Sequence, residues 1–229
     1  MAVPAADDTT RSYRVAIVTG GSHGLGREVT RTLADRGYAV VVHYARDQRA
    51  ADAAVEEVLA ANGTALTVRG DVADELDVER LFAETIKTFG GVDVVVHAVG
   101  QITLGPGPVV GLDTSGAPLP ASAPGTFVVN RQAARELRDG GAIVNIFGSV
   151  VGLAWPTRAA CTPSQDVAEA ITRVVADELR GRDITVNAVV LELERAGIIA
   201  DLVNLVAFLA SEDGHAVNGQ VIRLDGGLV

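Results

Sequence analysis

The sequence predicts a doubly wound α/β fold: one three-layer sandwich in which a seven-stranded parallel sheet lies between two layers of helices. Short β-branched runs, apolar on both faces, alternate with amphipathic stretches almost from end to end, which is typical of parallel strands joined by right-handed helical crossovers. The 229 residues, 48% of them hydrophobic, suffice for one large core. No repeat or linker divides the chain, so residues 1–229 are expected to form one domain, with 1–12 as a loose tail.

The alternation assigns each element in order. Seven runs are predicted to be strands because they are short, β-branched and continuously apolar: Arg14–Gly20, Tyr38–Tyr44, Thr64–Gly70, Val92–Ala98, Ala142–Phe147, Ile184–Val190 and Gly219–Leu224. Six intervening stretches have the apolar spacing of helices: 24–36, 47–61, 74–89, 126–138, 164–180 and 198–210.

Composition excludes several classes of protein. A formal charge of −10 argues against a nucleic-acid partner, because phosphate binding requires a basic surface. A single cysteine, Cys161, agrees with a reducing compartment. The acidic N-terminal run is not expected to be a signal peptide, and the longest apolar stretch near the end, Gly197–Ala210, is too short to cross a membrane. A cytoplasmic protein without a membrane partner is therefore expected, and no metal site is predicted.

One stretch breaks the alternation. Gln101–Gly125 contains five of the eight prolines and five glycines, so it is predicted to be a long loop rather than a helix. In a doubly wound sheet it follows the fourth strand at the edge where ligands bind. Both a pocket-lining flap and a surface loop without a function are consistent with this composition.

A glycine-rich turn follows the first predicted strand. The segment Val15–Gly26 joins that strand to a helix through Gly20, Gly24 and Gly26. Glycines at these positions permit a tight turn and a close approach to a pyrophosphate, which the uncapped N–H groups of the helix can bind. Because the turn lies between a strand and a helix, it predicts a dinucleotide site in a Rossmann-type fold.

The end of the second predicted strand bears on the choice of dinucleotide. A carboxylate there selects the ribose hydroxyls of NAD, whereas an arginine matches the 2′-phosphate of NADP. Arg46 lies at this point, with His23 and His43 as further candidates, and favours NADP(H). The adjacent Asp47 could pair with Arg46 or repel a phosphate, and NAD(H) remains the alternative cofactor.

These motifs resemble those of the short-chain dehydrogenase/reductase family over residues 13 to 229. Thr19–Gly26 is similar to the family's TGxxxGxG signature, Gly70–Val72 to its adenine-contacting Asp-Val, and Val92–Gly100 to its fourth strand and NNAG segment. The run from His43 to Arg46 resembles that of NADPH-using pteridine reductases. The residues assigned to the cofactor are Gly20, Ser22, His23, Gly24, Leu25, Gly26, Tyr44, Arg46, Asp71, Val72, Ala98 and Gly100.

The resemblance implies hydride exchange between a nicotinamide and a small carbonyl or alcohol substrate. Family members hold the substrate oxygen with a serine and a tyrosine, and a lysine lowers the pKa of the tyrosine. Ile143–Gly152 resembles the strand that ends in the catalytic serine, which makes Ser149 the candidate catalytic residue.

The tyrosine and the lysine of this site are absent. Family spacing places Thr162 and Asp166 at their positions, and the sequence has no lysine besides Lys87 and no tyrosine beyond residue 44. Thr162–Gln165 has instead the pattern of a helix start, with threonine as N-cap and proline at the first helical position.

Other parts of the family's site also differ. His97 and Ala98 replace the NNAG asparagines, and Ser122 stands where an active-site asparagine is expected. Leu191–Glu192 replaces the Pro-Gly that packs on the nicotinamide, and the substrate-covering loop is shortened to Leu193–Gly197.

The sequence is consistent with three functions. The first is an atypical NADP(H)-dependent reductase; the second is an inactive family member that binds a nucleotide or an active homologue. The third is a non-redox cyclase, dehydratase or isomerase with His97, Glu192 or Asp166 as acid or base. A homodimer or homotetramer is also expected, because Asp166–Arg180 has an apolar stripe of the kind that the family pairs between subunits. Packing within the monomer explains the same stripe.

Overall fold

The computed structural model describes residues 13–99, 122–149, 158–192 and 198–224. Within them, seven strands form one sheet in the order β3-β2-β1-β4-β5-β6-β7, and every neighbouring pair is parallel. The strand order changes direction between β1 and β4, which is the point where doubly wound sheets bind ligands. The predicted fold class is therefore confirmed.

The strands and helices follow one another as the sequence predicts. The strands are β1 Val15–Thr19, β2 Ala39–Tyr44, β3 Thr64–Arg69, β4 Val92–Val99, β5 Leu137–Ser149, β6 Thr185–Glu192 and β7 Val221–Leu224. The helices are α1 Gly24–Asp35, α2 Gln48–Ala60, α3 Glu75–Phe89, α4 Ser122–Glu136, α5 Arg158–Glu178 and α6 Ile198–Leu209, with short 3-10 turns at Arg180–Arg182 and Glu212–Gly214.

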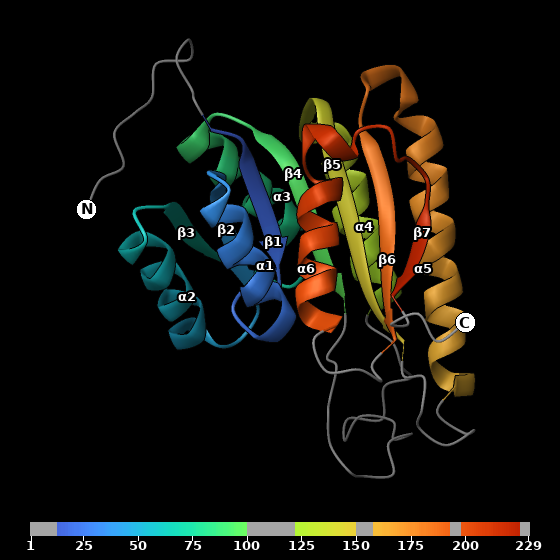
Figure 1. Ribbon diagram of the computed structural model, residues 1–229, viewed down its shortest axis with the longest axis horizontal. Helices are drawn as coiled ribbons and strands as arrows, with labels where there is room; N and C mark the ends of the chain where they lie inside the picture. Colours follow the sequence, from blue (N-terminus) through green and yellow to red (C-terminus); the bar gives the residue numbers. More distant parts are fainter. Residues whose placement is uncertain (1–12, 100–121, 150–157, 193–197, 225–229) are drawn as a thin grey trace.

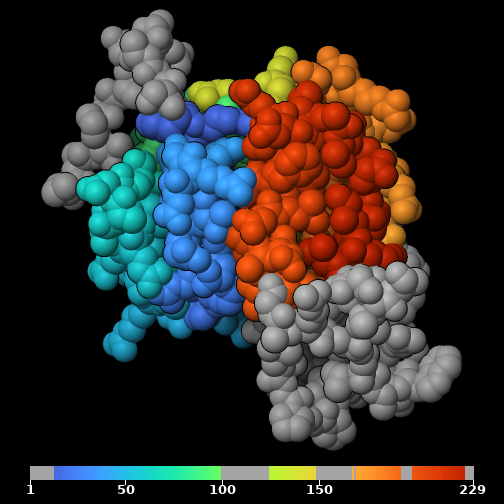
Figure 2. All heavy atoms as spheres, viewed as in Figure 1, coloured from blue at the N-terminus to red at the C-terminus, as the bar shows by residue number. Residues whose placement is uncertain are grey.

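Helices cover both faces of the sheet (Figure 1). On one face α1 and α6 lie side by side, with α2 beyond α1 (Figure 2), and Val29, Leu33 and Leu202 pack against alternate strand residues. On the opposite face α3, α4 and α5 contribute side chains such as Phe82 and Val129. Since both faces are buried, the central strands are continuously apolar rather than alternating.

Two helices begin earlier than the sequence predicts. α4 starts at Ser122, so the last four residues of the expected loop belong to its first turn. Pro124 is tolerated there because N–H groups in a first turn have no helical partner. α5 starts at Arg158, so the predicted helix start at Thr162 is wrong. A proline inside a helix removes one hydrogen bond but does not prevent the turn that precedes it.

The start of β5 also differs from the prediction. The strand begins at Leu137, directly after α4, and its register with β4 shifts between Val92 and Val94. Arg138 stabilises this start by donating to the Gly90 carbonyl at 2.8 Å and pairing with Asp93 at 3.3 Å. These partners lie about 45 residues earlier in the chain, so the local apolar pattern contained no sign of them.

The apolar stripe of α5 divides between two environments. Of the predicted stripe, Val175 packs against the core and Ile171 is partly buried. Val167 and Val174 are about half exposed. Core packing therefore accounts for part of the stripe only. No helix in the described ranges is both long enough and apolar enough to span a membrane.

Candidate functional site: a dinucleotide cradle

The turn between β1 and α1 has the geometry that an anion-binding loop requires. Gly20 and Gly24 have φ angles of +66° and +47°, which favour glycine. A Cβ added to Gly26 would overlap the carbonyl oxygen of Gly20, so only glycine permits this close approach. His23, the residue before α1, makes no side-chain cap, and nothing lies within 4 Å of a Cβ built on Gly24. The first turn of α1 can therefore receive a phosphate.

The other loop residues assigned to the cofactor have distinct surroundings. Ser22 is buried, and its hydroxyl lies 2.8 Å from Nδ1 of His23. Nε2 of the exposed His23 lies 3.3 Å from the Asp47 carboxylate, which links the start of α1 to the start of α2. Leu25 is partly buried and packs against the core. The imidazole of His23 is thus at the surface beside the turn, where it can reach a bound anion.

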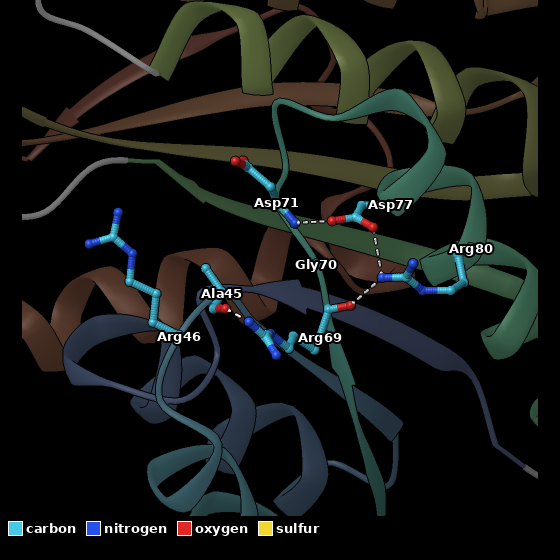
Figure 3. Close-up of a pocket in the computed structure, with 7 residues that line it drawn as sticks. All are labelled: Ala45, Arg46, Arg69, Gly70, Asp71, Asp77 and Arg80. Carbon is cyan, nitrogen blue, oxygen red and sulfur yellow. Dashed lines mark hydrogen bonds and ion pairs between the residues drawn. The ribbon is translucent and has the colours of Figure 1, made fainter. Parts of the chain in front are cut away.

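A pocket of about 470 Å³ opens at the carboxyl ends of β2 and β3 (Figure 3). Arg46 extends along its rim, and among the described residues it has no hydrogen bond or ion pair. Asp47 does not pair with it: its carboxylate accepts the Ala50 N–H at 3.0 Å and caps α2. That bond, with a smaller contribution from His23, lowers the pKa of Asp47. The guanidinium of Arg46 is therefore available to a ligand.

Two further arginines of this pocket were missed by the sequence analysis. Arg69 donates from Nε to the Ala45 carbonyl at 3.3 Å, which leaves its terminal nitrogens without a carboxylate partner in the described structure. Arg80 pairs with Asp77 at 2.8 Å and donates to the Arg69 carbonyl at 2.8 Å. Arg69 could have been identified from the sequence, because it directly precedes Gly70 and Asp71, which match the family's pattern. Arg80 could not be found this way, because it reaches the pocket from α3.

Asp71 lies at the edge of the same pocket and is fixed by its backbone. Its N–H donates to Asp77 at 2.8 Å, and its own carboxylate accepts the N–H of Ala73 at 2.9 Å. Tyr44 and Val72, in contrast, turn their side chains away from the pocket. Tyr44 is 6% exposed and packs against α2, and Val72 packs against the core next to Gly125. Any contribution of these two residues to cofactor binding comes from their backbones.

A row of buried polar side chains crosses the sheet beside the glycine loop, the turn from Gly20 to Gly26 between β1 and α1. Thr19, His97 and Asn145 are register partners on β1, β4 and β5. The Thr19 hydroxyl lies 2.8 Å from Nδ1 of His97, and Asn145 bonds to Asn130 of α4 at 2.9 and 3.0 Å. Nε2 of His97 has no hydrogen-bond partner in the described part of the chain, although the residue is 1% exposed. This burial lowers the pKa of His97 to about 3, so the imidazole is neutral at physiological pH.

The remaining predicted residues lie at the carboxyl edge of the sheet. Ala98 is in β4, with its carbonyl 3.6 Å from a Cβ built on Gly20. Ser149 ends β5 opposite Glu192 of β6, and Ser122 begins α4. Thr162 and Asp166 lie within α5. Five side chains lie outside the described part of the chain: those of Ser122, Ser149, Thr162, Asp166 and Glu192. Gly100 and residues 193–197 lie outside it entirely.

The tyrosines of this chain are not in reach of Ser149. Tyr13 packs edge-to-face on Phe89 and precedes β1, and Tyr38 precedes β2 and donates to the Ala210 carbonyl. Both therefore lie at the amino edge of the sheet. Tyr44 is under α2, and Lys87 is in the last turn of α3. In the described ranges, no cluster of three His, Cys, Asp or Glu residues could hold a metal ion.

The glycine contacts predict a graded response to alanine. Gly26→Ala should lower the free energy of unfolding by about 2–3 kcal/mol, because a buried overlap must be relieved by moving the loop. Gly24→Ala should cost only about 1–2 kcal/mol, since the backbone is left-handed but the space is open. Urea denaturation measures both, with Gly37→Ala as the control, because Gly37 has φ +86° and open space outside the loop. Equal losses at Gly26 and Gly37 would show that the loop is not closely packed.

Burial of His97 predicts a specific acid sensitivity. Its folded pKa lies below the unfolded value, so the unfolded chain binds the proton first as pH falls below about 6.5. Between pH 6.5 and 4.5, this one residue should lower the free energy of unfolding by about 2–3 kcal/mol. His97→Asn removes that contribution, so the two unfolding curves should be parallel from pH 7 to 8 and diverge below. Parallel curves down to pH 4.5 would mean that His97 is solvated.

The comparisons with known proteins agree with this geometry. The family model described as enoyl-(acyl carrier protein) reductase matches residues 20–192. A short-chain type dehydrogenase/reductase of Picea abies is 34% identical, covering 94% of this chain and 92% of its own length. A tetrahydroxynaphthalene reductase of Pyricularia oryzae is 29% identical over 93% of this chain and 89% of its own.

A solved structure is also similar. A short-chain dehydrogenase of Burkholderia cenocepacia in complex with NADP is 27% identical, with a TM-score of 0.78, and the match covers 93% of this chain and 97% of that one. The sheet order, the glycine loop and these matches lead to one conclusion. This chain belongs to the short-chain dehydrogenase/reductase family.

Proposed function

We propose that this protein binds NADP(H) and reduces the carbonyl group of a small molecule without the tyrosine–lysine pair of its family. The observation that carries the proposal is the pocket beside the glycine loop. There Arg46, which has no partner among the described residues, lies just after β2, where a 2′-phosphate would distinguish NADP from NAD. The Burkholderia relative, a structure in complex with NADP, supports the same cofactor.

The residues present fit the adenosine and pyrophosphate parts of this cofactor. The first turn of α1 would hold the pyrophosphate, because its N–H groups are uncapped and a Cβ at Gly26 would block the turn. Arg46 would hold the 2′-phosphate, with Arg69 as a second cation in the pocket. Asp71 would accept a hydrogen bond from the adenine. When bound, NADPH supplies the hydride, and a proton from water or from the substrate completes the reduction to an alcohol.

The missing proton donor restricts the substrate. General acid catalysis is worth about 10²–10⁴-fold, whereas positioning of the reactants can supply roughly 7–11 kcal/mol. Ser149 at the end of β5 would donate one hydrogen bond to the substrate oxygen. A substrate with its own acidic hydroxyl beside the carbonyl would supply the proton that tyrosine otherwise gives. The tetrahydroxynaphthalene named in the Pyricularia relative is a molecule of this phenolic kind.

An inactive, nucleotide-binding member is the second candidate. It is favoured by the joint replacement of the family's residues at Thr162, Asp166 and Ser122, and it would act together with an active homologue. A non-redox enzyme that uses His97 is less consistent with the structure. That imidazole is enclosed and accepts a proton only near pH 3, so it is a poor candidate for the acid or base of a substrate.

Assembly through α4 and α5 is part of the proposal. Phe127 of α4 and Val167 and Val174 of α5 are about half exposed. Large apolar side chains on adjacent helices support a homodimer or homotetramer, since burying them gains hydrophobic free energy.

Arg46→Ala should weaken NADPH binding by about 10- to 100-fold, because a charge-assisted hydrogen bond contributes about 1.5–3 kcal/mol. NADH has no 2′-phosphate, so its dissociation constant should change by less than about 3-fold. Calorimetric titration of both nucleotides measures the ratio. Arg49→Ala is the matched control, since Arg49 is exposed on α2 but does not line the pocket. Equal losses in the two variants would assign the effect to general charge rather than to contact.

Turnover distinguishes a reductase from an inactive member. NADPH oxidation is followed with aryl ketones that bear a neighbouring phenol and with their methyl ethers. We expect turnover of the phenols, a rate about 10²-fold lower for the ethers, and a further loss in Ser149→Ala. NADPH binding without oxidation of any of these pairs would favour the inactive member.

A further inference from the structure

His43 is a buried histidine that the proposed chemistry does not use. It lies one residue before the end of β2 and is 4% exposed. The neighbouring Tyr44 packs against α2, and because strand residues alternate, His43 faces the opposite side of the sheet, toward α3. This places its ring between the loop that follows β1 and the loop that follows β3.

The imidazole bonds to both loops. Its Nδ1 accepts the N–H of Gly20 at 3.4 Å, and its Nε2 lies 3.0 Å from the carbonyl oxygen of Gly70. The backbone carbonyl of His43 also accepts the N–H of Gly21 at 3.1 Å. Since Gly20 is a donor and Gly70 an acceptor, the ring is the neutral tautomer with its proton on Nε2. One side chain thus connects the glycine loop to the residue that precedes Asp71.

We propose that His43 is a positioning residue for the dinucleotide: it fixes the separation between the phosphate loop at Gly20 and the adenosine loop at Gly70–Asp71. The inference rests on the proposed cofactor binding. A dinucleotide must contact both loops at once, whereas an adenosine fragment contacts only the loop at Gly70–Asp71. A connection between the loops therefore matters for the whole cofactor and not for the fragment.

The connection depends on the neutral ring. The titratable groups around it are Asp71, Asp77 of α3 and His97 of β4. Burial lowers the pKa of His43, although the Gly70 carbonyl and the two carboxylates oppose this shift. The bridge is therefore complete at neutral pH. In acid, a proton on Nδ1 would face the N–H of Gly20, so that two donors would oppose each other and the bond would be lost.

Three variants separate the two bonds. Asn places an oxygen close to the position of Nδ1, so His43→Asn keeps an acceptor for Gly20 and loses the Gly70 bond. Gln places a nitrogen close to Nε2, so His43→Gln keeps the Gly70 bond and loses the acceptor. His43→Leu removes both hydrogen bonds and fills the buried position with an apolar side chain. Tyr38→Phe is the control, because it removes a buried hydrogen bond to the Ala210 carbonyl at the opposite edge of the sheet.

Dissociation constants for NADPH and for adenosine 2′-monophosphate are measured by calorimetry from pH 5 to 8. At pH 7.5, His43→Leu should weaken NADPH binding by about 10-fold, the order expected for two net hydrogen bonds. The same variant should change binding of the fragment by less than about 2-fold, and the Asn and Gln variants should lie between wild type and Leu. The ratio of the Leu and wild-type constants for NADPH should fall in acid once His43 is protonated, because the wild type then loses its bond to Gly20 and keeps only the one to Gly70.

Several outcomes would overturn the inference. Equal losses for NADPH and the fragment would mean that His43 acts on the adenosine site alone. A loss in Tyr38→Phe as large as that in His43→Leu would assign the effect to stability. A ratio that is unchanged at a pH where NMR of the His43 ring shows it protonated would mean that the neutral ring is not required. If the wild type binds neither probe, the proposed function itself has failed, whereas NADPH binding unaffected by His43→Leu rejects only the positioning role.

Discussion

The structure around the site depends on one constraint: polar groups buried at the carboxyl ends of the central strands must find hydrogen-bond partners. Thr19 and His97 satisfy one another, Asn145 is held by Asn130, and His43 reaches Gly20 and Gly70. Each of these bonds joins two different elements. Together they fix the ends of β1, β2, β4 and β5, and the loops that follow β1 and β3, in one arrangement.

The exception to this rule is informative. Nε2 of His97 is buried and finds no partner among the residues that the structure describes, and a buried polar atom without a partner costs free energy. The family's pattern has an asparagine at this point, which is smaller than histidine and has no ring nitrogen to leave unpaired. We therefore expect the histidine to lower stability in acid, while its bond to Thr19 holds the end of β1, where the glycine loop starts.

The two halves of the proposed site differ in how far they keep the family's pattern. The adenosine and pyrophosphate half has its glycines, its Asp71 and a pocket with three arginines. The substrate half has Ser149 without the tyrosine and lysine that usually assist it. A protein with this combination would keep the positioning of a reduced cofactor and depend on the substrate for the proton. Affinity for the cofactor and rate of reduction should accordingly respond to different residues.

The sequence predicted the fold because the apolar runs and the glycine turn are local signals. Each central strand is buried on both faces, so its pattern can be read without knowing its neighbours. The glycine loop is equally local, because Gly20, Gly24 and Gly26 act within seven residues. Contacts between distant segments were not predictable in this way. Arg80 reaches the pocket from α3, Arg138 fixes the start of β5 through Gly90 and Asp93, and Thr162 did not begin its helix.

By itself, then, the sequence determined the strand–helix order, the place of the phosphate loop and the absence of a YxxxK pair, since each follows from neighbouring residues or from composition. Only the tertiary structure decided which side chains are available at the site. Asp47 caps α2 and therefore does not pair with Arg46, and His97 is buried. Tyr44 packs against α2, and His43 lies between the loops that follow β1 and β3. The reason is physical: burial and hydrogen bonding are shared by segments that meet only after the sheet has formed.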